Sequence, residues 1–284
     1  MTERAKRIGT GAAFALLAAF GAGLAAANAE PALPLAPHRA AYEISLVAAD
    51  DSAPSSGQTP ISAAGLIAYE FRGSACEGYA ANFRQVTELQ RSEGDPVASD
   101  VRSITFEDGA GKTMRFEIEG QTGGADDPAV SGAASRNDDG QTTVDLAKPE
   151  KTKLDIGKNI LFPTQHVAAI IAAAKAGETT LQARVYDGSD TGKKVFATFT
   201  VIGKATTGAD SDSAVSDKLE GVKRWPVTIS YFDEATPDRP ADYTLGFDLY
   251  ENGVSGSLKL DYGTFALAAK LAKIEWLPVT ACDK

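Results

Sequence analysis

Two cysteines, Cys76 and Cys282, are the residues of this 284-residue chain whose types and spacing most clearly indicate chemistry. They are 206 residues apart and form no Cys-x-x-Cys motif, so a reactive dithiol has little support. An oxidising compartment leaves this pair a single pairing, which would tie an early segment to the end of the chain. We therefore expect a structural Cys76–Cys282 disulfide, and a redox role is the weaker alternative.

The two histidines, His38 and His166, are the other side chains that could bind a metal or transfer protons. Neither belongs to a His-Glu-x-x-His motif or has a third ligand at metal-binding spacing. The sequence therefore predicts no metal site. His166 lies near the start of a predicted helix, where we expect a packing or capping role.

Motifs for catalysis and cofactor binding are also incomplete. Gly111-Lys112-Thr113 matches the end of a phosphate-binding loop, but Phe106 occupies the position of its first glycine, so we predict a turn. A Gly-x-Ser-x-Gly elbow is absent from the sequence. A catalytic pair of carboxylates cannot be recognised without geometry. We predict no catalytic residues and no cofactor.

The first 29 residues have the pattern of an export signal. Residues 4–7 include three basic side chains, residues 8–24 carry no charge, and Ala27-Asn28-Ala29 is a small-x-small cleavage sequence. We predict cleavage between Ala29 and Glu30. An uncleaved membrane anchor is the alternative, but the uncharged run is short and weakly apolar for a stable span. The product would be a periplasmic protein with no remaining membrane span.

Loss of this leader changes the formal charge from −10 to −12, because the leader holds three basic residues and one acidic residue. Proteins that bind nucleic acids present a basic face, from which binding releases counterions. A chain with this excess of carboxylates lacks such a face, so we expect no nucleic-acid partner.

The dominant hydrophobic period of residues 30–284 is two, which is typical of strands buried on one face. The alternating apolar residues are Tyr42-Ile44-Leu46, Met114-Phe116-Ile118, Leu181-Ala183-Val185, Val195-Ala197-Phe199-Val201, Trp225-Val227-Ile229-Tyr231 and Tyr243-Leu245-Phe247-Leu249. Dipeptides that favour tight turns are Asp108-Gly109, Asp139-Gly140, Asp187-Gly188 and Asn252-Gly253. Residues 30–284 are predicted to form one mostly antiparallel β domain.

One helix is predicted within this β domain, over residues 167–175. Thr164 is its expected N-cap and Gly177 its expected end, and Lys175 lies in the last turn, where a positive charge favours the helix dipole. An apolar stripe is formed by Val167, Ile170, Ile171 and Ala174. The helix should therefore lie across a face of the sheet.

Two segments, residues 50–59 and 203–217, are rich in small and polar residues and are expected to be loops. The second would be a domain linker or a long hairpin tip. We favour the tip, because the predicted disulfide spans any domain boundary placed there.

Several short motifs together resemble one protein family. They are His38-Arg39-Ala40-Ala41-Tyr42, Tyr69-Glu70-Phe71-Arg72-Gly73, Cys76-Glu77-Gly78-Tyr79, Leu161-Phe162-Pro163-Thr164-Gln165-His166, Trp225-Pro226-Val227-Thr228-Ile229-Ser230-Tyr231-Phe232, Leu249-Tyr250-Glu251-Asn252-Gly253-Val254 and Leu260-Asp261-Tyr262-Gly263. Their combination resembles the EipB family of periplasmic cell-envelope integrity proteins of alphaproteobacteria. The resemblance implies an all-β, mostly antiparallel spiral or partly open barrel around one α-helix, clamped by Cys76 and Cys282 and similar in outline to LolA and LolB. It supplies no catalytic residues.

We expect a non-enzymatic periplasmic protein that supports envelope integrity and stress resistance by binding an envelope component, such as a lipid or glycan, or a protein partner. The curved sheet would supply a concave binding face. One alternative is a lipid or lipoprotein carrier of the LolA and LolB type, which requires a continuous apolar cavity. A less favoured alternative is an envelope glycan hydrolase, which requires two carboxylates roughly 5 to 9.5 Å apart.

Overall fold

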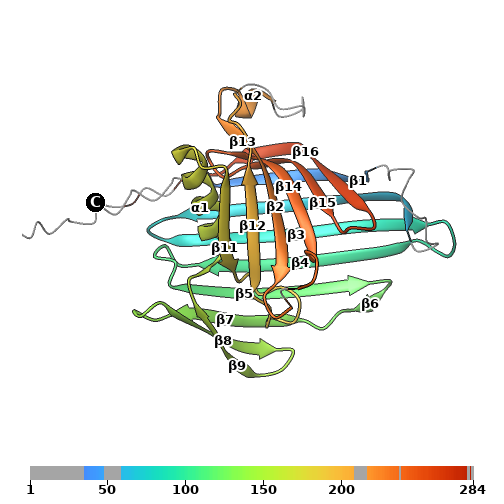
Figure 1. The fold of residues 1–284 in the computed structure, drawn as a ribbon. Helices are drawn as coiled ribbons and strands as arrows, with labels where there is room; N and C mark the ends of the chain where they lie inside the picture. Colours follow the sequence, from blue (N-terminus) through green and yellow to red (C-terminus); the bar gives the residue numbers. More distant parts are fainter. Residues whose placement is uncertain (1–34, 48–58, 208–215, 237, 280–281, 283–284) are drawn as a thin grey trace, which may run out of the picture. The chain divides into compact units, whose positions relative to one another are not determined.

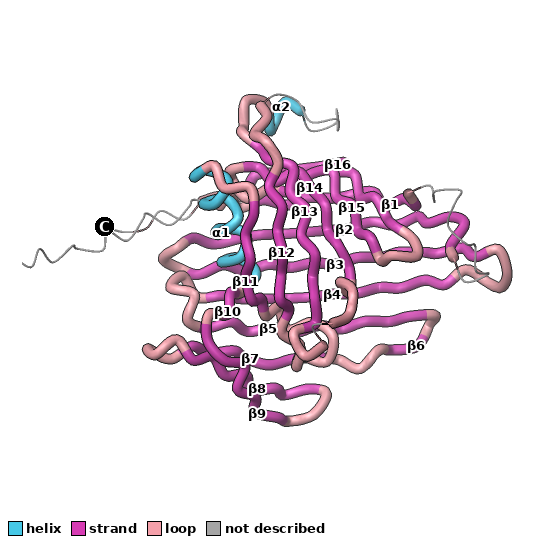
Figure 2. The backbone as a smooth tube through the Cα atoms, viewed as in Figure 1, coloured by secondary structure: helices cyan, strands magenta, loops and turns pink. Residues whose placement is uncertain are grey.

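The apolar alternation of the sequence produces one long β-sheet in the computed structural model, which describes residues 35–47, 59–207, 216–236, 238–279 and 282. Figures 1 and 2 show the arrangement of the sixteen strands and two helices of these residues. The strands are β1 (His38–Leu46), β2 (Pro60–Ser74), β3 (Gly78–Arg91), β4 (Val97–Glu107), β5 (Thr113–Thr122), β6 (Ala125–Asp126), β7 (Val130–Arg136), β8 (Gln141–Lys148), β9 (Thr152–Lys158), β10 (Ile160–Leu161), β11 (Thr180–Val185), β12 (Phe196–Ile202), β13 (Arg224–Asp233), β14 (Tyr243–Tyr250), β15 (Ser255–Asp261) and β16 (Ala266–Trp276). The helices are α1 (Pro163–Ala176) and α2 (Ser216–Leu219). The predicted fold class is confirmed, and the predicted leader lies outside the described residues.

Strands that pair in the sheet are mostly neighbours in the sequence. The order is β10-β11-β12-β13-β14-β15-β16-β1-β2-β3-β4-β5-β7-β8-β9, and β6 pairs with β5. The ladder between β10 and β11 is parallel, and the other ladders of the described strands are antiparallel. The two ends of the path, β9 and β10, are consecutive in the chain. The sheet therefore curves round into a nearly closed barrel.

Strands β11 to β15 cross β1 to β5 in Figure 1, and the side chains between the two sections form an apolar core. Phe71 of β2 packs there in one cluster with Val227 of β13 and Phe247 of β14. Ile170 and Ile171 of α1 belong to the same cluster and are fully buried. The apolar stripe thus places the helix against the sheet, as predicted from its spacing.

The start of α1 differs from the prediction. Thr164 is not the cap, because Phe162 is the N-cap residue and Pro163 is the first helical residue. Proline is favoured there since the N–H that it lacks would have no partner inside the helix. The N–H of Thr164 instead donates to Oε1 of Glu107 at the end of β4, at 2.8 Å. Gly177 ends the helix in the left-handed conformation with φ 82°, as predicted.

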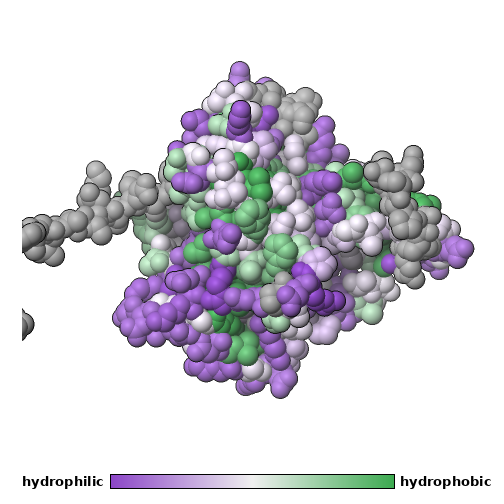
Figure 3. Space-filling view, viewed as in Figure 1, coloured by the Kyte–Doolittle hydropathy of each residue, from purple (hydrophilic) through white to green (hydrophobic). Residues whose placement is uncertain are grey.

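Strand β12 buries the face opposite to the one predicted. Phe199 and Val201 are 39% and 47% exposed, whereas Thr198 and Thr200 point inward and are buried. The inward face also carries Phe196 and Ile202, each 3% exposed, and Oγ1 of Thr198 lies 3.4 Å from Nε2 of the buried His166 on α1. Sliding a strand by one residue exchanges its two faces, so burying Phe196 and Ile202 turns Phe199 and Val201 outward. Hydrophobic side chains accordingly appear on the outer surface of the upright strands in Figure 3.

The predicted turns are formed in part. Residues around Gly111 make the expected turn, in which Gly111 has φ 64° and the carboxylate of Asp108 accepts the N–H of Lys112 at 3.1 Å. The Asp187-Gly188 pair does not form a tight hairpin turn. It belongs to a longer loop over residues 186–195, which connects β11 to β12. That loop forms one wall of the site described below.

Cys76 and Cys282 form the expected disulfide, with their Cα atoms 5.7 Å apart. Of the predicted loops, residues 50–58 and 208–215 lie outside the described residues. The end of the second loop was predicted wrongly, since residues 216–217 begin α2. The strands on either side of it, β12 and β13, are antiparallel neighbours, so this segment connects the two strands of a hairpin.

Candidate functional site

The barrel has a seam where the two ends of its sheet meet. The end strand β10 has only two residues, and the described residues of β9 and β11 on either side of it form no backbone ladder with each other. Arg184 of β11 bridges this seam: Nη1 donates to the carbonyl oxygen of Lys158 at 2.5 Å, and Nη2 to that of Ile156 at 3.1 Å. Nε and Nη2 also donate to the two carboxylate oxygens of Glu234, at 2.6 and 2.7 Å. One guanidinium, with its five N–H donors, therefore joins the two edges in place of backbone hydrogen bonds.

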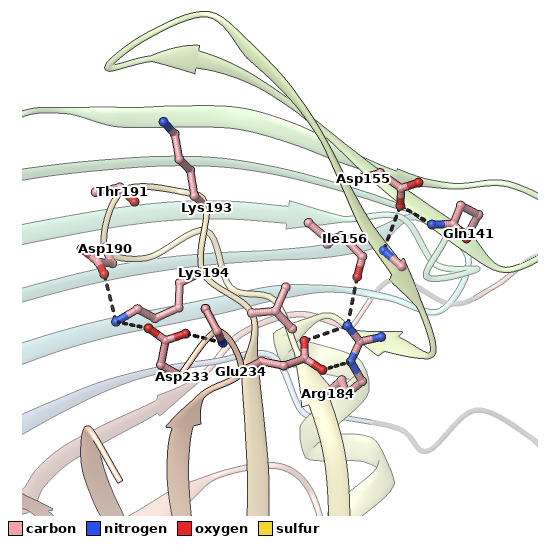
Figure 4. Close-up of a pocket in the computed structure, with 13 residues that line it drawn as sticks. Gln141, Asp155, Ile156, Arg184, Asp190, Thr191, Lys193, Lys194, Asp233 and Glu234 are labelled. Atoms are coloured by element: carbon pink, nitrogen blue, oxygen red, sulfur yellow. Dashed lines mark hydrogen bonds and ion pairs between the residues drawn. The ribbon is translucent and has the colours of Figure 1, made fainter. Parts of the chain in front are cut away.

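A cleft of about 850 Å³ opens beside the seam (Figure 4). Its walls come from β8 and β9, from the loop over residues 186–195, and from the end of β13 with the residues that follow it. The lining includes Arg184, Asp190, Thr191, Lys193, Lys194 and Asp233. Ligand pockets typically measure roughly 300–1,000 Å³, so the cleft has the size of a binding site, although its lining is unusually rich in charge.

Lys194 fastens the loop of the cleft to the sheet. Its Nζ lies 3.0 Å from a carboxylate oxygen of Asp190, 3.7 Å from one of Asp233 and 3.0 Å from one of Asp242. Burial lowers the pKa of Lys194, but its hydrogen bonds to Asp242 and Asp190 outweigh burial and raise the pKa above the ordinary value. The ammonium therefore stays charged at neutral pH and cannot serve as a base.

The carboxylates that line the cleft are all engaged. Asp190, Asp233 and Glu234 pair with the two cations described above. Asp155 accepts from the side-chain amide of Gln141 and from a backbone N–H 3.0 Å away. Among the described residues, no group of three or more His, Cys, Asp or Glu side chains is placed to hold a metal ion. The side chains of the cleft therefore present hydrogen-bond donors and acceptors to which a polar ligand can bind.

The residues that the sequence singled out lie elsewhere in the barrel. Cys76 is in the turn after β2, His38 begins β1, and His166 is a buried residue of α1; none of them lines the cleft. Arg184 and Lys194 were missed by the sequence analysis. Their only sequence signal is that charged residues flank an Asp-Gly pair, which does not reveal that β9 lies opposite.

A smaller cavity of about 80 Å³ lies between α1 and the inner face of β2 to β4. Glu107 lines it, is 2% exposed, and has no hydrogen-bond partner for Oε2 among the described residues. Burial raises the pKa of Glu107 more than the N–H of Thr164 lowers it. The volume is well below that of ordinary ligand pockets, so this cavity does not support the lipid-carrier alternative.

Comparison with known proteins assigns this chain to a family. Residues 29–278 match the model of a family described as EipB-like. The chain belongs to the EipB-like family. It is similar to the cell envelope integrity protein EipB of Brucella abortus (strain 2308), with 39% identity over 251 residues, 88% of this chain and 87% of that protein. The resemblance noted from the sequence motifs is thereby confirmed.

The structure of this EipB-like chain is also similar to a solved one. The crystal structure of a beta-barrel-like protein of a domain of unknown function from Brucella abortus superposes with a TM-score of 0.77 and 37% identity. The match covers 86% of this chain and 98% of the other. In the part of the chain that the structure describes, neither helix is long and apolar enough to cross a membrane.

Proposed function

We propose that this chain helps to maintain the cell envelope as a non-enzymatic periplasmic binding protein, and that the seam cleft holds its envelope ligand or protein partner. The name of its Brucella relative, a cell envelope integrity protein, supports the envelope role. The observation that carries the binding role is the charged cleft of about 850 Å³ beside the seam. Its size suits a ligand or a protruding segment of a partner.

The chemistry of the cleft favours a polar ligand. Arg184, Lys193 and Lys194 supply donors, and Asp155, Asp190, Asp233 and Glu234 supply acceptors. Lys193 extends away from the others in Figure 4 and is exposed. A glycan or a polar peptide segment can form hydrogen bonds with these side chains. An acyl chain would displace water from the charged groups of the cleft and offer them no hydrogen bonds in return.

A chromosomal replacement tests the binding role. Thr191→Trp puts an indole into the cleft from an exposed loop position, where the core is not disturbed. Thr207→Trp, at an exposed loop position that does not line the cleft, is the matched control. We expect cells with Thr191→Trp to become as sensitive to detergent as cells lacking the gene, and cells with Thr207→Trp to grow normally. Equal growth of both strains would remove the cleft from the proposal.

The enzymatic alternative has its own test. Asp190→Asn and Asp233→Asn each keep the shape of a cleft carboxylate but remove its charge. A glycan hydrolase that used either group would lose its activity in the corresponding variant. We expect no release of soluble sugar from purified envelope glycan by the wild-type protein or by either variant. Release of soluble sugar from purified envelope glycan by the wild-type protein, abolished in these variants, would contradict a non-enzymatic role.

The periplasmic location rests on the predicted leader. This leader is supported by the order of its three parts within the first 29 residues: a basic stretch, an uncharged stretch and a small-x-small cleavage sequence. The family match, which begins at residue 29, also supports it. We expect protein recovered by osmotic shock to begin at Glu30, as N-terminal sequencing or intact mass will show. Recovery of a chain that retains residues 1–29 would refute the proposed processing.

A further inference from the structure

The solvent face of β16, β1, β2, β3 and β4 carries a cross-strand row with short side chains in its middle. The ladders align Lys273, Ala41, Ala68, Arg84 and Arg102 as successive neighbours. Facing residues of adjacent strands lie close together, so this row runs straight across the sheet. Since the two alanines end at Cβ and their neighbours are long, the row contains a hollow floored by alanine.

This hollow is the centre of a groove of about 460 Å³, which we call the alanine groove. Ile104, which also lines it, is 55% exposed. In the adjoining row, Leu66 and Val86 face each other and are 57% and 39% exposed. Large apolar side chains are thus concentrated on one small area of the outer surface, which is typical of a binding surface.

The rim of the alanine groove is positively charged, although the chain as a whole has a formal charge of −10. The charged lining residues are Arg39, Arg84, Arg102, Lys273, Glu70 and Glu275. Both lining carboxylates pair with Arg39. The remaining three cations therefore face the groove without a lining carboxylate of their own.

One neighbouring carboxylate serves two of these cations. Asp100 pairs with Arg84 at 2.8 Å and with Arg102 at 3.2 Å, and the hydrogen bond from Arg84 lowers the pKa of Asp100 to about 2. Lys273 forms no ion pair with another described residue. Arg84 gives Asp100 two of its N–H groups and Arg102 gives one, so an anion placed beside these two arginines would meet donors that are still available.

We propose that the alanine groove binds an acidic amphiphile, with its alkyl chain on the alanine floor and its phosphate or carboxylate head at the adjacent guanidinium groups of Arg84 and Arg102. The row from β16 to β3 spans three strand spacings, about 14 Å, which gives an alkyl chain room to lie across the sheet. The groove shares no lining residue with the seam cleft, so this proposal goes beyond the function proposed above. Either proposal can fail without the other.

Isothermal titration with dodecyl phosphate, below its micelle concentration, tests the proposal on disulfide-bonded protein from the periplasm. We expect saturable binding at one site, and at least tenfold weaker binding of dodecyl maltoside and of inorganic phosphate. Ala68→Phe fills the floor and should weaken binding at least tenfold. Ala64→Phe, on the same exposed face of β2 but outside the groove, is the matched control. Phenylalanine is favoured on exposed strand positions, so both variants should fold, as circular dichroism will verify.

Arg102→Gln separates the charge from the apolar floor, and it leaves Asp100 its ion pair with Arg84. It should weaken dodecyl phosphate severalfold and leave the weak binding of dodecyl maltoside unchanged. The proposal is overturned if dodecyl maltoside binds as tightly as dodecyl phosphate, if Ala64→Phe and Ala68→Phe weaken binding equally, or if the wild type shows no saturable binding. Binding of an acidic amphipathic peptide without any binding of dodecyl phosphate would also overturn it and would identify the groove as a protein interface.

Discussion

His166 provides a quantitative test of how α1 is held against the sheet. It is 4% exposed on the inner side of the helix, and its Nε2 lies 3.4 Å from Oγ1 of Thr198. Burial lowers the pKa of His166 from 6.5 to about 4, because a charged imidazolium loses its hydration there. The unfolded chain therefore takes up a proton at a higher pH than the folded protein does.

The sign and size of the effect follow from this difference in pKa. Because the unfolded state binds more protons between pH 6.5 and 4, the stability contributed by His166 is complete above pH 6.5 and is lost as the pH falls through that window. Between pH 7.5 and pH 5 the free energy of unfolding should fall by about 2 kcal/mol through this residue, and by about 3 kcal/mol once the pH is below 4.

Equilibrium urea unfolding at pH 7.5 and pH 5, followed by the fluorescence of the buried Trp225, measures this loss. His166→Phe is the reference variant, because it keeps an aromatic ring and leaves Thr198 its hydrogen bond to Ala183 at 3.1 Å. Subtracting the loss in the variant from the loss in the wild type removes the contributions that other titrating groups, such as Glu107, make to the change in the free energy of unfolding. We expect the wild type to lose about 2 kcal/mol more than the variant. Equal losses would show that His166 does not titrate as its burial implies.

Three further changes test the disulfide, the seam and the buried carboxylate. Cys76→Ser opens a loop of 206 residues and should cost at most about 5 kcal/mol, seen as a lower Tm; an unchanged Tm would contradict a structural role. Arg184→Met should speed amide hydrogen exchange in β9, whereas Glu234→Gln, which keeps the guanidinium at the seam, should change it much less; equal rates in both would refute the bridging role. Glu107→Gln should abolish a loss of stability that the wild type shows in urea as the pH rises above 4.5, because the raised pKa of Glu107 makes its charged form unfavourable in the fold. A parallel pH profile for the variant would contradict this assignment.

Local patterns in the sequence accounted for much of the architecture. Tyr42 and Ile44 are buried as their alternation predicted, because a period of two is a property of the extended backbone itself. Ile170 and Ile171 are buried for the corresponding reason in a helix. These inferences needed no knowledge of which strands pair.

Errors arose where the outcome depended on a distant partner. Strand β12 carries a hydrophobic alternation, yet the face with Phe199 and Val201 is exposed, because the opposite face buries Phe196 and Ile202 in the core. Thr164 has the right residue type for a cap, but Glu107 of β4 accepts its N–H and Pro163 begins the helix. Intrinsic preference is a weak guide when tertiary contacts supply the hydrogen bonds.

The sequence alone determined the all-β class, the helix with its inward stripe and the pairing of the only two cysteines, since each of these depends on local periodicity or on a count. The tertiary structure decided where binding surfaces exist. The seam cleft forms because the barrel brings the two ends of its sheet together at Arg184. The alanine groove forms because five strands align in one register around Ala41 and Ala68. Registers between distant strands are set by the packing of the whole sheet, and no local segment of the sequence records them.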